Sequence, residues 1–181
     1  MSTTLSKSVL SKYKNDIFVE TGTLWGEAVE VAIECGFKKI YTVDIDPKKV
    51  EHSRKKFSKE IKTGQVEVLE GDTFKIFPDM IKKVDAPATF WFDAHWDGGP
   101  MGDYKCPLPF ELEALLTHPI KTHTLLVDDR RIFGAIGSNW GEDLDEELLI
   151  EAMTDINPDY KISFEDGCVP DDIIVAKLDE V

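Results

Sequence analysis

Short apolar runs alternate with helical patterns along most of the chain. Apolar runs at 17–20, 39–44, 66–70, 88–92 and 124–127 predict strands. Apolar residues at helical spacing between these runs predict helices at about 26–35, 47–61, 73–82 and 109–117. Strands that alternate with helices in this way form a parallel sheet with helices on its faces. The pattern therefore predicts an α/β fold.

The two ends of the chain complete this arrangement. Residues 4–14 predict a short amphipathic helix that packs on the core. An acidic helix at about 143–156 is followed by runs at 160–164 and 173–178, which a short polar loop joins into a hairpin. There is no repeat, linker or second domain in the pattern, so residues 1–181 are expected to form one domain in which 1–14 is a packed N-terminal helix.

The stretch 17–46 indicates a ligand site. Its first apolar run ends in Glu20, a turn with Gly22 and Gly26 follows, and the second run closes on Asp44. A helix that joins two parallel strands brings both strand ends to one edge of the sheet, where open α/β folds bind ligands. A glycine turn lets a ligand approach the backbone, and an acid after the second strand can accept hydrogen bonds from a ribose diol. We expect a ligand that carries a nucleoside.

The turn differs from a dinucleotide fingerprint. That fingerprint reads G-x-G-x-x-G, whereas here Glu20 replaces the first glycine and Leu24 holds the middle position. A carboxylate at this place would repel a pyrophosphate but could attract an ammonium group. An NAD or FAD site and a Rossmann-like unit without a ligand nevertheless stay open as alternatives.

The pattern E-x-G-x-x-x-G, followed by an acid that ends the next strand, resembles motif I and post-I of class I S-adenosylmethionine (SAM)-dependent methyltransferases. The resemblance covers essentially the whole chain. It implies a Rossmann-like, seven-stranded, mostly parallel sheet with helices on both faces and a C-terminal antiparallel hairpin, whose last strand lies beside the fifth. It also implies that SAM is bound by Glu20, Thr21, Gly22, Thr23, Gly26, Asp44, Asp72 and Asp93. For Asp72, a simple helix cap is an equally good interpretation.

A second set of polar residues follows the fourth and fifth runs. Asp93 and His95 come after 88–92, and Asp128 and Asp129 come after 124–127. Carboxylates that converge there would repel one another unless a cation or basic residues neutralise them. Oxygen ligands of this kind suit Mg²⁺. Because an imidazole titrates near neutral pH, His95 is a candidate proton acceptor, and we expect Asp93 and His95 to be the catalytic residues.

These residues resemble the macrocin-type sugar O-methyltransferases, which carry a D-x-D segment after strand four and D-D-Y after strand five. By that resemblance Asp93, Asp128 and Asp129 are metal ligands, and His95 stands where the base is an aspartate. Arg130 replaces the tyrosine. The chain is also similar to small bacterial proteins with a D-A-H-[YW]-x-G-G segment.

Simpler roles for the same residues stay open. Asp128 and Asp129 could pair with Arg130 and Arg131, and His95 could be an ordinary hydrogen-bonded loop residue. The two arginines could instead bind an anionic group of the substrate. Substrate is expected to contact the loops at 95–110 and 130–142.

Charge and cysteine content narrow the function classes. The formal net charge is −14 with a pI near 4.6, which argues against nucleic acid or an anionic membrane as a partner. The three cysteines are far apart in the sequence, and no leader or membrane-spanning run is visible, so a cytoplasmic protein with reduced thiols is expected.

Together these patterns predict a SAM-dependent methyltransferase that acts on a hydroxyl of a small molecule, such as a sugar or glycan intermediate, with help from Mg²⁺. Three alternatives are another enzyme on the same fold, a non-catalytic module that binds SAM or S-adenosylhomocysteine (SAH), and a nicotinamide dehydrogenase. The sequence predicts neither the acceptor nor the oligomeric state.

Overall fold

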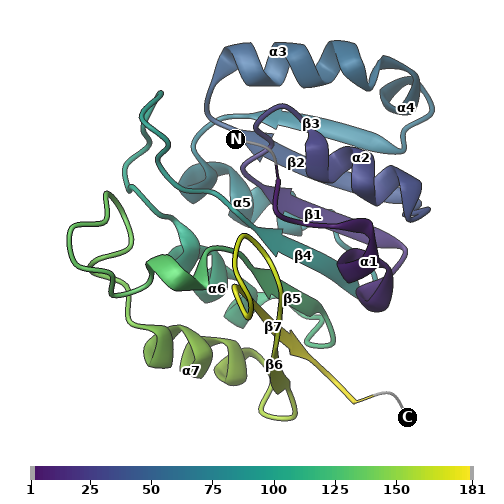
Figure 1. Ribbon diagram of the computed structural model, residues 1–181. Helices are drawn as coiled ribbons and strands as arrows, with labels where there is room; N and C mark the ends of the chain where they lie inside the picture. The colour runs from purple at the N-terminus through teal and green to yellow at the C-terminus, as the bar shows by residue number, and fades with distance from the viewer. Residues whose placement is uncertain (1–2, 180–181) are drawn as a thin grey trace.

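The computed structural model describes residues 3–179 and contains one seven-stranded sheet in the order β3-β2-β1-β4-β5-β7-β6 (Figure 1). The strands are β1 (Ile17–Thr21), β2 (Lys39–Asp44), β3 (Val66–Glu70), β4 (Ala88–Phe92), β5 (Thr124–Val127), β6 (Lys161–Glu165) and β7 (Ile173–Lys177). Strands β1 to β5 pair in parallel, and β7 runs antiparallel to both β5 and β6. The predicted Rossmann-like sheet is confirmed, including the position of the last strand beside the fifth.

Helices cover both faces of the sheet (Figure 1). One face carries α1 (Lys7–Leu10), α2 (Glu27–Glu34), α3 (Pro47–Lys56) and α4 (Ser58–Lys62), and the other carries α5 (Thr73–Ile81), α6 (Leu108–Thr117) and α7 (Glu146–Ile156). Successive side chains of a strand point to opposite faces, so Phe18 joins one hydrophobic cluster and Val19 the other. Because both faces are buried, the central strands read as continuous apolar runs.

Helix boundaries differ from the predictions where a local contact overrides the periodicity. The helix expected over 47–61 breaks at Phe57, whose backbone leaves the helical region and whose ring is buried. Residues 4–14 form the single turn α1 and the 3₁₀ turn η1 (Ser11–Tyr13), because Ser6 caps α1 by accepting a hydrogen bond from Val9 N. Helix α7 begins at Glu146 because Asp145 caps it.

The strand order reverses between β1 and β4, which is where α/β sheets form ligand crevices. The carboxyl ends of β1, β2, β4 and β5 lie at this edge. Antiparallel β7 adds its amino end, so that Asp172 also reaches the edge. Within residues 3–179, no helix is both long and apolar enough to cross a bilayer.

Candidate functional site

A cavity of about 520 Å³ opens at the carboxyl edge of the sheet. This volume is in the range of small-molecule and cofactor sites. Nine of the residues predicted from the sequence line it: Glu20, Gly22, Thr23, Asp44, Asp72, Asp93, His95, Asp128 and Asp129. Thr21 and Gly26 lie behind its wall, where Gly26 faces the Phe57 ring that a Cβ atom would meet at 2.5 Å.

The glycine turn packs against two neighbouring strands. The amides of Gly22 and Thr23 donate hydrogen bonds to the carbonyl of Val43 at 3.0 and 3.1 Å. Gly22 has φ +86°, and a Cβ atom there would lie 2.6 Å from the carbonyl oxygen of Asp93. Glycine is therefore required by the approach of the β4 end as well as by the backbone conformation.

Glu20 is more buried than the sequence suggests. Its side chain is only 2% exposed and accepts a hydrogen bond from the Thr42 hydroxyl at 2.5 Å. Burial raises the pKa of Glu20 to about 8, while the Thr42 hydroxyl acts in the opposite direction. At neutral pH the carboxyl of the ligand-free protein therefore mostly carries a proton, which corrects the expectation of a charged acid at this position.

Asp44 and Asp72 both organise backbone at the cavity. Asp44 Oδ2 accepts a hydrogen bond from Leu24 N at 2.7 Å and Oδ1 accepts one from Asp46 N at 2.8 Å, so this carboxylate holds the glycine turn and the start of α3. Asp72 caps α5 through Phe74 N at 3.1 Å and also accepts from Asp103 N at 2.9 Å. The helix-cap interpretation of Asp72 is thus observed, at a position that also lines the cavity.

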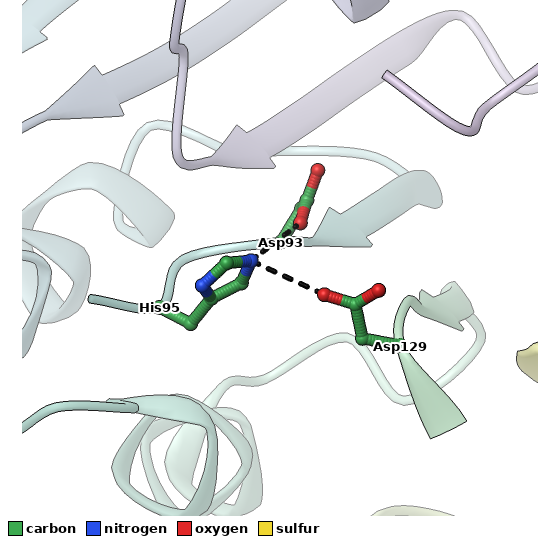
Figure 2. A group of neighbouring side chains, drawn as sticks. All are labelled: Asp93, His95 and Asp129. Atoms are coloured by element: carbon green, nitrogen blue, oxygen red, sulfur yellow. Dashed lines mark ion pairs between the residues drawn. The ribbon is translucent and has the colours of Figure 1, made fainter. Parts of the chain in front are cut away.

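The ends of β4 and β5 meet, as the sequence predicts, and bring an imidazole between two carboxylates. Figure 2 shows His95 Nε2 turned toward both acids, 3.2 Å from Asp129 Oδ2 and 3.7 Å from Asp93 Oδ1. Burial, and then the charges of Asp128 and Asp129, raise the pKa of Asp93. For Asp129 burial acts in the same direction, but His95 and Arg131 outweigh it and lower the pKa.

The Asp128 side chain does not contact His95 as those of Asp93 and Asp129 do. Its Oδ2 accepts a hydrogen bond from the Thr4 hydroxyl, and its buried Oδ1 has no hydrogen-bond partner. Burial is the main cause that raises the pKa of Asp128 to about 6. The sequence predicts one set of metal ligands, Asp93, Asp128 and Asp129. Among residues 3–179, the structure instead contains two groups of side chains close enough to share an ion, and both include Asp129. These groups are Asp93–His95–Asp129 and Asp128–Asp129–Asp172. An orphaned buried carboxylate oxygen beside such groups fits a bound cation.

Both arginines after β5 are already paired. Arg131 Nη1 lies 2.6 Å from Asp129 Oδ1 and also pairs with Asp172. Arg130 pairs with Glu146 at 2.9 Å and lies over the ring of Phe164. Of the ion pairs considered in the sequence analysis, the one between Asp129 and Arg131 forms. The interpretation of these arginines as a site for an anionic substrate group does not fit, because neither guanidinium is free.

Two buried acids of this region were missed in the sequence. Asp172 is 1% exposed and lies in the hairpin loop, directly before β7. The feature of the sequence that could have revealed Asp172 is its position directly before an apolar strand, which pairs with β5. Glu111 is also 1% exposed, and neither of its oxygens has a hydrogen-bond partner. Its signal was its position among Leu108, Leu112 and Leu115 on the apolar face of α6.

The burial of Glu111 leads us to expect that the stability of the folded protein depends on pH. Burial raises its pKa to about 8 from 4.5, and the neighbouring Thr21 hydroxyl acts in the opposite direction. Between these values the folded chain holds a proton that the unfolded chain releases, so this group's contribution to the free energy of unfolding falls as pH rises from about 4.5 to 8. We expect Glu111→Gln to gain stability relative to the parent across this window, as measured by urea unfolding near its two ends. Glu113→Gln, at an exposed position of the same helix, is the control. A pH-independent difference for Glu111→Gln would contradict the buried neutral carboxyl.

Comparison with known proteins shows similarity at the level of three-dimensional structure. No protein-family model matches the chain, and no curated protein matches it in sequence. An O-methyltransferase from Bacillus cereus, solved with SAH, superposes with a TM-score of 0.64 at 15% identity over 96% of this chain and 78% of that chain. A Podospora anserina methyltransferase, also solved with SAH, gives 0.61 at 16% identity over 96% and 76%. The chain has the methyltransferase fold.

A third similar structure is described with a different kind of acceptor. A Clostridium thermocellum protein described as a candidate rRNA methylase superposes with a TM-score of 0.63 at 13% identity over 94% of both chains. The methyltransferase fold therefore accommodates different acceptors, and the acceptor of this chain has to be argued from its own site.

Proposed function

We propose that the protein is a SAM-dependent methyltransferase that acts on a hydroxyl of a small molecule, such as a sugar or glycan intermediate. One observation carries the proposal: a single cavity joins the glycine turn and Asp44 to the cluster of Asp93, His95 and Asp129. A cofactor and an acceptor that occupy the two parts of this cavity would meet at the end of β4. The methyltransferase fold and the SAH found in two similar structures support this use of the cavity.

The charges of the cavity wall favour a cationic cofactor. Besides the neutral Glu20, the wall contains eight acids and only three Lys or Arg residues, namely Lys49, Lys105 and Arg131. Lys49 is paired with Asp97 at 2.6 Å, and Arg131 is paired with Asp129. SAM brings an ammonium and a sulfonium to such a site, whereas the pyrophosphate of NAD would bring unfavourable negative charge. This supports SAM over a dinucleotide.

The proposed reaction is a direct in-line transfer. The acceptor oxygen forms a bond to the methyl carbon while the bond from that carbon to sulfur breaks, which leaves SAH and a methyl ether. The proton of the hydroxyl passes to the pair formed by Asp93 and His95. The raised pKa of Asp93 makes it a better proton acceptor than an ordinary aspartate. Orientation of the two substrates in one cavity supplies most of the remaining acceleration.

The acid cluster could hold a divalent cation, for which Asp93, Asp128 and Asp129 are the ligands suggested by the sequence. Such an ion would supply positive charge that lowers the pKa of a bound hydroxyl. Asp93 and Asp129 would serve it from the ends of neighbouring strands, and Asp128, which lines the same cavity, has one oxygen without a hydrogen-bond partner.

A small-molecule acceptor also agrees with the charge of the whole chain. At a net charge of −14, long-range repulsion disfavours rRNA or an anionic membrane as a partner. We therefore propose a small-molecule enzyme of the cytoplasm.

Calorimetric titration of the full chain with SAM, SAH and NAD, each with Mg²⁺ and with EDTA, tests the proposal. We expect micromolar binding of SAM and SAH, and much weaker binding of NAD. Tighter binding of NAD than of SAM would overturn the methyltransferase assignment in favour of a dehydrogenase. If SAM binds but a panel of hydroxylated acceptors yields no methyl ether, the chain is a SAM-binding module instead.

A further inference from the structure

A histidine nitrogen lies at the centre of the acid cluster. His95 Nε2 is 3.2 Å from Asp129 Oδ2 and 3.7 Å from Asp93 Oδ1, and the ligand atoms of the three residues lie within 4.8 Å of one another (Figure 2). Two ligands bound at about 2.0–2.2 Å to one ion lie roughly 3–3.5 Å apart. We propose that His95, with Asp93 and Asp129, binds a divalent metal ion that accepts nitrogen ligands, such as Mn²⁺, Co²⁺ or Zn²⁺, in preference to Mg²⁺.

The neighbouring group of acids already holds a cation that belongs to the chain. The guanidinium of Arg131 pairs with Asp129 Oδ1 and with Asp172, which neutralises the side of the cluster away from His95. Asp129 Oδ2 remains directed at His95. Asp128 is turned toward the Thr4 hydroxyl through one of its oxygens. Arg131 therefore favours the His95 side as the place for an added ion.

The second nitrogen of His95 supports its role as a ligand. The ring stacks on Trp140, with centroids 4.4 Å apart and planes 13° from parallel, and its buried Nδ1 has no hydrogen-bond partner. His95 and Glu111 both line a small cavity of about 10 Å³, and both Glu111 oxygens are likewise unpartnered. The cavity is just large enough for one water, and His95 and Glu111 are polar groups in its otherwise largely apolar lining that would bind it.

That arrangement matches the usual surroundings of a metal-binding imidazole. Such an imidazole commonly donates its other N–H to a carboxylate or to water, which fixes the ring and leaves the first nitrogen free for the metal. Glu111, through a water in the small cavity, can accept this hydrogen bond from Nδ1. Glu111 is thereby a positioning residue for His95, which gives a reason for an otherwise unpartnered buried acid.

The nitrogen ligand determines the class of ion. Imidazole suits Zn²⁺ and the first-row transition metals, whereas Mg²⁺ prefers oxygen ligands and retains water. An ion bound through Nε2 would occupy the lone pair with which His95 could otherwise accept a proton. The inference adds to the proposed function but can fail separately from it, because ion binding is measured without SAM.

Calorimetry of the metal-free full chain with Co²⁺, Mn²⁺ and Mg²⁺, together with the visible spectrum of bound Co²⁺, tests the inference. We expect Co²⁺ and Mn²⁺ to bind at least about tenfold more tightly than Mg²⁺. Glu111→Leu, which removes the acceptor, should weaken Co²⁺ binding roughly tenfold, and His95→Asn should weaken it further. His95→Asp restores an all-oxygen set and should shift the preference back toward Mg²⁺. His52→Asn, which changes an exposed histidine outside the cluster, is the matched control.

Several results would overturn the inference: equal affinity for Mg²⁺ and Co²⁺, unchanged Co²⁺ binding in His95→Asn, or no binding of any of the ions. Circular dichroism shows whether each variant is folded. If His95→Asn does not fold, pulsed electron paramagnetic resonance of Mn²⁺ bound to the unmodified chain gives an independent answer. Coupling to an imidazole nitrogen supports the assignment, and its absence overturns it.

Discussion

Gly22→Ala is expected to weaken both the fold and SAM binding. The left-handed backbone at φ +86° costs an alanine about 1–2 kcal/mol. The added Cβ also meets the Asp93 carbonyl oxygen at 2.6 Å, and because this neighbour is a backbone atom directly after the central strand β4 it cannot rotate away. Such overpacking costs a further ~1–3 kcal/mol. We expect the free energy of unfolding in urea to fall by about the sum of these two terms.

The same clash displaces the glycine turn from the end of β4, where cofactor and acceptor are proposed to meet. We expect SAM affinity, measured by calorimetry, to fall by about tenfold or more, which is about 1.4 kcal/mol. Gly64→Ala is the matched control, because Gly64 has φ +79° but nothing within 4 Å of the added atom. A loss of stability in Gly64→Ala as large as that in Gly22→Ala would show that the contact with β4 is unimportant.

Asp44→Ala is expected to have the largest effect on cofactor affinity. Asp44 accepts hydrogen bonds from the amides of Leu24 and Asp46, and its proposed ligand contact is with the ribose. A hydrogen bond to a charged group contributes about 1.5–3 kcal/mol, so loss of the ribose contact alone should weaken SAM and SAH binding by roughly 10- to 150-fold. Disorder of the glycine turn would add to this loss. Calorimetric titration with both ligands measures the effect.

Asp145→Ala separates binding from stability. Asp145 also accepts hydrogen bonds from two backbone amides, but it caps α7 and does not line the cavity. Removal of this cap should cost about 0.5–2 kcal/mol of stability and leave SAM affinity unchanged. If Asp44→Ala loses stability but keeps its affinity for SAM, the ribose role of Asp44 is wrong.

The strands and helices of this fold could be predicted because the burial of each one is visible in the order of apolar and polar residues along the chain. A strand buried on both faces, such as Ala88–Phe92, is apolar at every position, and this signal needs no knowledge of its partners. The break at Phe57 could not be predicted in the same way. It depends on the packing of that ring beside Gly26, a contact between positions about thirty residues apart in the sequence.

The same distinction applies to the candidate site: the positions of its residues could be predicted, but the contacts between distant segments could not. Asp93, His95, Asp128 and Asp129 could be predicted to converge because they end neighbouring parallel strands. The direction of the Asp128 side chain could not be predicted, because Thr4 determines it from a position 124 residues away. The pairing of Asp129 with Arg131, two residues further on, was one of the alternatives that the sequence left open. The charge state of Glu20 was also beyond the sequence, since it depends on a depth of burial that only the assembled sheet creates.

The hydrogen bond from Thr4 to Asp128 joins residues that are 124 positions apart, and the cavity wall extends from Thr3 to Cys168. During synthesis, the first wall residues leave the ribosome long before the last ones are translated. A nascent chain released before β5 therefore has the glycine turn but lacks β5 itself and the wall residues Asp128, Asp129, Arg131 and Cys168, so we expect SAM not to stabilise it. Truncated products should remain open to proteases whatever the SAM concentration, whereas a chain that contains β5 and β7 and binds SAM as proposed should gain protection from it.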